Sequence, residues 1–184
     1  MSDKMSDNKE IINILIVIDS ETILDRYGTN SNPDQPVQIT QPDLIYIVTK
    51  QASVVSGQAG NELTFGAGTS NTIGGILWRA TSLSLNSDNK IIFYKFTSFS
   101  SKNIISTPKP FLDTVKVPLP NPNDPTNPTI QEIQMYFWYS TVLNSGSATY
   151  HFCFFIVDRH GNKLGYYWWD PSITIKVPLQ KISE

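Results

Sequence analysis

The chain has 184 residues with 14 basic and 16 acidic side chains, giving a formal net charge of −2. This length fits one domain, and the absence of any run of Lys and Arg argues against binding to nucleic acid or to an anionic membrane. Charged residues make up only 16% of the chain, below the typical value of about 25%. Weak charge repulsion therefore favours self-association and predicts a homo-oligomer.

The N-terminal residues Met1–Glu10 are polar and are expected to form a flexible tail ahead of a domain over residues 11–184. No apolar segment follows a basic start, and Ile11–Ile18 is too short to span a bilayer. The single cysteine, Cys153, cannot form an internal disulfide. With no classical signal peptide, the chain is expected to be cytoplasmic.

The first third of the chain predicts a strand, a short helix and a loop. Ile11–Ile18 is rich in β-branched residues, which is typical of a strand covered on both faces. Asp19 offers an N-cap for a helix over residues 20–27, and Gly28 can end that helix. The prolines and Asx residues of Thr29–Asp43 predict a loop.

The middle of the chain predicts several short strands. Gly74 and Gly75 interrupt the apolar pattern of Thr72–Arg79, which indicates a bulge or a close backbone approach. Five prolines between Pro118 and Pro128 predict an exposed loop, because proline disrupts central strands and helices. The other elements expected here are strands at Leu44–Thr49, Leu63–Phe65 and Ile91–Phe96, and a turn at Gly57–Gly60.

The last third of the chain alternates strands with one clear turn. Asp158–Gly161 has the Asp-x-x-Gly pattern of a type I turn and predicts a hairpin between its flanking strands. The strands expected in this part are Ile133–Tyr139, Thr149–Val157, Lys163–Trp169 and Ile173–Val177. Many short strands divided by Gly, Pro and Asn predict an all-β fold, a single β-sandwich of the jelly-roll or Ig-like kind.

Catalytic chemistry is not expected from these residues. His151 and Cys153 lie two residues apart on one predicted strand, but the neighbouring phenylalanines predict an inert core thiol. His160 falls in the predicted turn, and no second Cys or His pair completes a zinc site. The sequence holds no nucleophile elbow, phosphate-binding loop or dinucleotide fingerprint, so we expect a protein that is not an enzyme.

Two segments offer candidate ligand-binding residues. Asn86, Asp88 and Asn89 form a compact set of oxygen donors suited to calcium or sugar hydroxyls, although an ordinary Asx turn is the favoured explanation. On a strand, Tyr166 and Trp168 face one way while Tyr167 and Trp169 face the other, so one pair is expected at the surface. Exposed aromatic faces bind sugars or another subunit, and the candidate residues here are Trp168, Trp169 and Asp170.

The segment Trp168–Ile173 reads Trp-Trp-Asp-Pro-Ser-Ile, and further short motifs precede it along the chain. In combination these motifs resemble the AidA/PixA inclusion body protein family of Gram-negative bacteria, which has a characteristic Tyr-Trp-Asp-Pro-x-Ile segment near the C-terminus. The resemblance extends from about Ile11 to Val177 and includes Ile14–Leu24, Leu44–Lys50, Val55–Gln58, Leu63–Phe65, Trp78-Arg79, Thr81–Leu83, Asn86–Asp88 and Ile91–Tyr94.

The resemblance implies a cytoplasmic protein that accumulates as inclusions in bacteria living with animal or plant hosts. It carries over no catalytic residues. The family's namesake is rich in methionine, whereas this chain has only Met1, Met5 and Met135, so a sulfur reserve is not expected. The leading hypothesis is an inclusion-forming protein for host interaction or storage. The alternative is a lectin-like module that binds glycans, with or without calcium, and needs no other cofactor.

Overall fold

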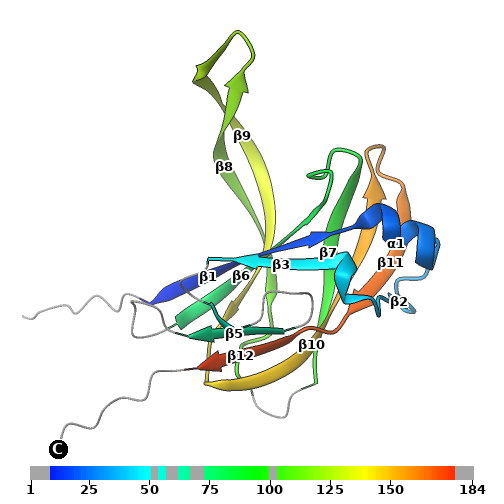
Figure 1. The fold of residues 1–184 in the computed structure, drawn as a ribbon, viewed down its shortest axis with the longest axis vertical. Helices are drawn as coiled ribbons and strands as arrows, with labels where there is room; N and C mark the ends of the chain where they lie inside the picture. Colours follow the sequence, from blue (N-terminus) through cyan, green and yellow to red (C-terminus); the bar gives the residue numbers. More distant parts are fainter. Residues whose placement is uncertain (1–8, 51–53, 57–61, 67–72, 100–102, 177–184) are drawn as a thin grey trace, which may run out of the picture.

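The computed structural model describes residues 9–50, 54–56, 62–66, 73–99 and 103–176, which form two β-sheets and one α-helix (Figure 1). The expectation of an all-β, sandwich-like fold is confirmed. Most of the N-terminal tail, the turn at Gly57–Gly60 and Val177 lie outside the described residues. The helix, α1, is too short to cross a membrane, and no other helix among the described residues is long and apolar enough to do so.

The first sheet has five strands in the order β3-β1-β6-β9-β8. In chain order its members are β1 (Glu10–Ile18), β3 (Ile45–Thr49), β6 (Ile73–Ser82), β8 (Lys109–Asn121) and β9 (Asp124–Thr141). β1 pairs in parallel with β6 and antiparallel with β3. β9 pairs with β6 only through its last residues, Trp138–Thr141. The rest of β9 pairs with β8 alone and lies away from the sheet.

The second sheet has seven strands, built around the long strand β10. Its members are β2 (Val37–Gln38), β4 (Val54–Ser56), β5 (Glu62–Gly66), β7 (Asn89–Ser98), β10 (Gly146–Asp158), β11 (Lys163–Trp169) and β12 (Ser172–Lys176). β10 pairs antiparallel with β7, with β11 and with β12. The predicted strands are therefore present, including the β10–β11 hairpin, whose Asp158 accepts hydrogen bonds from the turn it begins.

The core between the sheets consists of aliphatic ladders and stacked aromatic rings. Phe152 of β10 lies at its centre and contacts the rings of Trp78, Phe93, Trp138 and Trp169 at centroid distances of 4.7 to 6.1 Å. Every second residue of β1 joins this core, namely Ile12, Ile14, Ile16 and Ile18.

The expectation that β1 is covered on both faces is wrong. Ile11 and Leu15 point away from the core and are 50% and 37% exposed. The second sheet covers one side of β1, and the other side forms part of an outward surface. The apolar run of β1 indicates that both faces of the strand are apolar. It does not indicate that both faces are covered.

The predicted helix is confirmed as α1 (Ser20–Tyr27). The Asp19 carboxylate caps its first turn by accepting hydrogen bonds from the Thr22 N–H at 3.0 Å and the Thr22 hydroxyl at 2.8 Å. Gly28 ends the helix with a φ of 69°, a left-handed value that glycine adopts without a steric cost.

The predicted bulge is also confirmed. The pairing of β1 with β6 shifts register between Glu10 and Ile11, opposite Gly74 and Gly75. The Tyr139 ring of β9 lies directly on Gly75, where a Cβ atom would meet ring carbons at 2.7 Å. Gly75 thus serves the close approach of an aromatic ring to a backbone.

The proline-rich segment Pro118–Pro128 was expected to be a loop and is instead part of a β-hairpin. β8 and β9 pair over almost their whole length, with only Pro122 and Asn123 in the turn. Each strand of a two-stranded hairpin has one edge without a hydrogen-bonded neighbour, so prolines whose nitrogens face that edge break no ladder bond. The segment is exposed, as predicted, but it is extended and paired.

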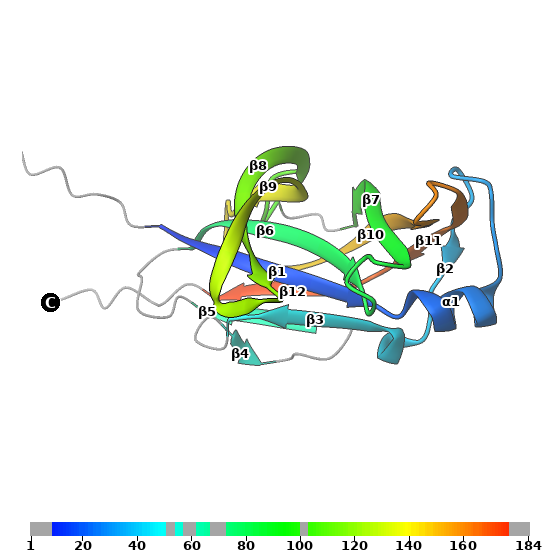
Figure 2. The ribbon, with the colours of Figure 1, turned by 90° about the horizontal axis from the view of Figure 1, so that it is seen from above.

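Residues 111–137 of this hairpin project from the sandwich as an arm whose tip lies far from every other element in Figure 1, and Figure 2 looks down on this arm. The base of the arm is fixed to the second sheet by Tyr136. Its hydroxyl donates to the Phe93 carbonyl at 2.9 Å and accepts from the Trp138 indole N–H at 2.9 Å. The arm therefore leaves the body at a defined point.

Candidate functional site

The loop between β6 and β7 holds the first group of predicted ligand residues. Asn86 has a φ of 64°, and its side-chain oxygen accepts hydrogen bonds from the Ser82 and Ile91 N–H groups at 3.3 and 3.4 Å. Its own N–H donates to the Ser82 hydroxyl at 2.9 Å. The side chain of Asn86 is therefore used to shape the loop, as in the simple Asx-turn interpretation.

The other two residues of this loop point to different surroundings. Asp88 is exposed and accepts only a long hydrogen bond of 3.4 Å from the Ser87 hydroxyl, while the Asn89 amide donates to Ser20 on α1 at 3.4 Å. Within the described ranges, no three His, Cys, Asp or Glu residues are grouped as a metal site. Calcium or sugar binding at this loop stays a prediction.

The second group lies at the end of β11 and is divided by the strand. Trp169 is only 1% exposed and stacks on Phe93 and Phe152, so its assignment to a surface site is wrong. It points inward because alternate residues of a strand face opposite sides. Trp168 is half-buried on the outward side, and Asp170 is exposed just after it.

Trp168 belongs to a group of three tilted aromatic rings that no local sequence pattern indicates. The His151 imidazole lies between Phe99 and Trp168, with centroid distances of 4.1 and 4.0 Å. Partial burial lowers the pKa of His151, and the Asp170 carboxylate opposes that shift in part. Finding this stack requires the strand register, because residues 99, 151 and 168 are distant in sequence.

Cys153 fits the expectation of an inert core thiol. The residue is 7% exposed, and burial raises the pKa of its thiol, with the nearby Lys95 charge opposing the shift. A protonated thiol is a poor nucleophile. Cys153 is therefore suited to packing in the core.

The outward side of the five-stranded sheet, which we call the outer face, is largely apolar and exposed, with Asn13 and Arg79 as polar residues on it. Tyr46 and Val48 of β3 are 46% and 51% exposed and pair with Val17 and Leu15 of β1. The registers of β1 with β6 and of β6 with β9 bring Leu77 and Tyr139 to the same side. These residues form one surface, because strand registers align side chains on a common face.

The outer face continues onto one side of the arm. Phe111 pairs with Phe137, and Val115 pairs with Ile133, so their side chains share this side. The apolar residues on this side of the arm are Phe111, Val115, Val117, Leu119, Ile133, Met135 and Phe137. Asp113 lies among these apolar residues, and Asp124 pairs with Asn121 at the tip.

The opposite side of the arm is mixed in character. Lys116 and Glu132 face each other there at 3.9 Å, with side chains 74% and 64% exposed. Leu112 and Ile130 lie on the same side, each 61% exposed. The two sides of the arm therefore differ in charge although both reach solvent.

A groove of about 380 Å³ lies where the arm leaves the sandwich. Its walls come from the arm base, from β6 and from the start of β7, and they include the aromatic residues Trp78, Phe93, Tyr136, Phe137 and Trp138. Arg79 and Lys90 also line the groove, which has no carboxylate in its lining. Arg79 is held by the Asn13 side chain at 2.7 Å and lies 5.8 Å from the Phe137 ring centre.

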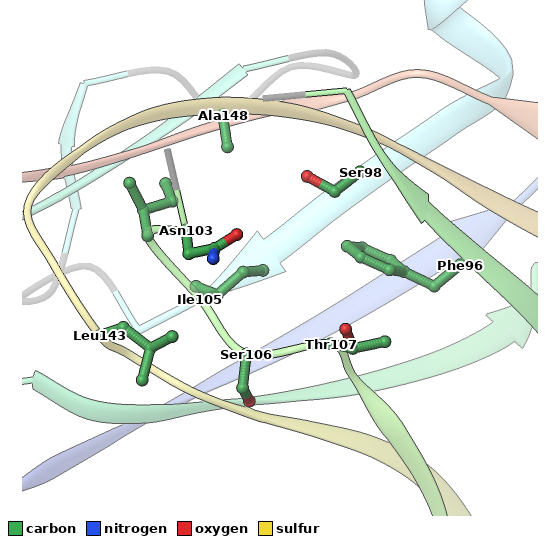
Figure 3. Close-up of a pocket in the computed structure, with 9 residues that line it drawn as sticks. Phe96, Ser98, Asn103, Ile105, Ser106, Thr107, Leu143 and Ala148 are labelled. Carbon is green, nitrogen blue, oxygen red and sulfur yellow. The ribbon is translucent and has the colours of Figure 1, made fainter. Parts of the chain in front are cut away.

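A second, smaller pocket of about 170 Å³ lies between the end of β7 and the segment 103–107 (Figure 3). Phe96, Ser98 and Thr107 point into it, and Leu143 and Ala148 complete its wall. This volume is below the roughly 300–1,000 Å³ of typical ligand pockets. The groove is larger than this pocket and adjoins the outer face.

Comparison with known proteins identifies the group to which this architecture is related. The family model described as "PixA: Inclusion body protein" matches residues 10–175. A crystal structure of an inclusion body protein (PixA) from Burkholderia cenocepacia J2315 has a TM-score of 0.73 and 18% identity, covering 91% of this chain and 97% of that one. No curated protein matches the chain. At this identity the structural likeness shows a common fold.

Proposed function

Because the chain belongs to the PixA inclusion body protein family, we propose that it forms inclusions by associating with further copies of itself through the outer face. The observation that carries this proposal is the exposed and largely apolar surface that runs from β3 to the arm. Monomers rarely expose contiguous apolar patches larger than a few hundred Å², and larger ones mark interaction sites.

The low charge of the chain supports the same proposal. A net charge of −2 leaves little repulsion between copies. The proposed role is non-enzymatic: inclusions in the cytoplasm would store the protein or supply it for interaction with a host. The family and the chemistry of the outer face support this role together.

Analytical ultracentrifugation tests the proposal directly. The wild-type protein should sediment as an oligomer in a concentration-dependent way. Replacing Val48 and Leu15 together by Asp should weaken association at least 10-fold, because it adds charge to the apolar surface. The matched control, Leu143→Asp, changes a residue that is 51% exposed and outside this surface, and it should associate like the wild type. A monomeric wild type at all concentrations would refute the proposal.

Carbohydrate binding near Trp168 is a second proposal. It is favoured by the outward Trp168 ring beside the exposed Asp170 carboxylate, since an aromatic ring stacks on a sugar while a carboxylate accepts its hydroxyls. A glycan array, run with calcium and with a chelator, tests it. Binding should fall with Trp168→Ala, and calcium dependence should fall with Asp88→Ala. A blank array with folded protein would exclude this role for the glycans displayed.

A further inference from the structure

We infer that the arm of each molecule docks in the groove of a second copy, whose own arm docks in return in the first. The inference rests on the proposed self-association and specifies its partner surface. It assigns distinct roles to two features that adjoin each other in one chain, the arm as ligand and the groove as receptor.

The arm requires a partner on physical grounds. An isolated two-stranded hairpin is marginally stable in water, and stability needs a third strand or packing against another element. Leu119 near the tip is 41% exposed and Phe111 at the base is 46% exposed, so the apolar side is open along its whole length. A hairpin of this length keeps its shape more easily when that side is covered.

The groove offers a surface of matching chemistry. It is lined by aromatic rings, and Arg79 and Lys90 line it without a carboxylate among the described lining residues. The apolar side of the arm presents aliphatic and aromatic side chains together with the carboxylate of Asp113. The contact therefore joins apolar area on both sides and brings a carboxylate of the arm towards the cations of the groove.

The apolar surface of the groove is continuous with that of the arm. Ile133, Met135 and Phe137 belong both to the apolar side of the arm and to the groove lining. An arm that enters the groove of a second copy therefore also lies against the base of that copy's arm. The same two patches then meet twice around a two-fold axis, which closes the pair.

The reach of the arm fits this arrangement. Ten residue steps separate Phe111 from Asn121 at the turn, and an extended strand rises about 3.3 Å per residue, or roughly 33 Å in all. This length lets the tip extend over a neighbouring sandwich while the base remains fixed by the Tyr136 hydrogen bonds.

Two double variants separate the arm from the groove. The arm variant, Val117→Lys with Leu119→Lys, adds positive charge to the apolar side near the tip and so opposes the cations of the wild-type groove. The groove variant, Leu85→Asp with Lys90→Glu, makes the groove acidic; Leu85 has a φ of 53° and is 80% exposed, a conformation that Asp tolerates. Their controls are Leu112→Lys with Ile130→Lys on the opposite side of the arm, and Leu143→Asp with Lys95→Glu outside the groove.

Sedimentation of each variant alone and of an equimolar mixture gives the test. Each double variant should dimerise at least 10-fold more weakly than the wild type, and both controls should dimerise normally. The mixture should recover a heterodimer, because one of its two contacts joins an intact arm to an intact groove and the other joins the basic arm to the acidic groove. This recovery is the result that simple surface disruption does not produce.

The failures of the two proposals differ. One outcome is that the arm variant is impaired, the groove variant dimerises like the wild type, and the mixture shows no recovery. Arms then contact arms, so the docking inference is wrong while self-association stands. If the wild type is monomeric at every concentration, both proposals are wrong.

Discussion

The sandwich and the arm have similar alternating patterns of apolar residues, but these residues are buried in the sandwich and reach solvent in the arm. In the sandwich, every second residue of β1 is buried against the second sheet. In the arm, every second residue of β8 near the tip is also apolar, but these residues are half-buried or exposed. The difference teaches that alternation specifies a face and that only the tertiary fold decides what covers that face.

The largest effect separating the two regions should come from the core. Trp78→Ala removes a side chain that is 0% exposed and contacts both Tyr150 and Phe152. Truncation of a buried aromatic side chain costs about 3–5 kcal/mol, a large part of the stability of one domain. Chemical denaturation should show this loss. A loss below about 1 kcal/mol would mean that Trp78 does not organise the core.

A smaller effect is expected where the outer face meets the sandwich. Gly75→Ala places a Cβ against the Tyr139 ring and should cost about 1–3 kcal/mol, as overpacking does. Adding Tyr139→Ala should recover part of this loss, because the clash disappears. Additive losses in the double-mutant cycle would show that the ring and Gly75 are independent.

The cap of α1 should contribute less than either. Asp19→Ala removes the acceptor of the Thr22 N–H and hydroxyl hydrogen bonds and should cost about 0.5–2 kcal/mol. Asp19→Asn, which keeps an acceptor, should recover most of the stability in thermal unfolding. Equal losses for the two variants would contradict a capping role.

A pH effect is expected at the ring stack on the second sheet. Burial lowers the pKa of His151 in the folded protein, so the unfolded chain binds the proton more readily. Stability should therefore fall as the pH drops from about 6.5, the ordinary histidine value, towards the folded pKa. His151→Phe should lose less stability than the wild type between pH 7 and pH 5. Identical slopes would rule out His151 as the source.

The smallest effect on stability is expected in the arm. Val117→Asp should change the unfolding free energy of the monomer by less than about 0.5 kcal/mol, as surface substitutions usually do, even though it weakens association. Its matched control is Ile130→Asp on the opposite side. Thermal unfolding in dilute solution checks this, and a loss comparable to that of Trp78→Ala would place the arm inside the cooperative core.

The sequence predicted the elements whose signals are local. Asp19 and Gly28 bound the helix, the paired glycines indicate the bulge, and the Asp158–Gly161 turn indicates a hairpin. It failed where a distant element decides the outcome. The prolines of residues 118–128 predict a loop, because the pairing of β8 with β9 leaves no local pattern. The apolar run of β1 likewise does not indicate that one of its faces is open.

The candidate site shows the same limit. Alternation along β11 correctly separated Trp168 from Trp169, but identifying which of the two points inward required the position of the first, five-stranded sheet. The stack of Phe99, His151 and Trp168 depends on the pairing of β10 with two other strands. The groove is lined by residues from several elements, and its existence follows only from the point at which β9 leaves β6.

The prolines of the arm also limit how the protein can aggregate. Pro110, Pro118 and Pro120 occupy even-numbered positions of β8, so their nitrogens face one edge and offer no N–H to an incoming strand. Growth by backbone pairing at that edge, the route to cross-β fibres, is thereby discouraged. Copies are left to pack side chain against side chain, which favours a reversible deposit of folded molecules over amyloid.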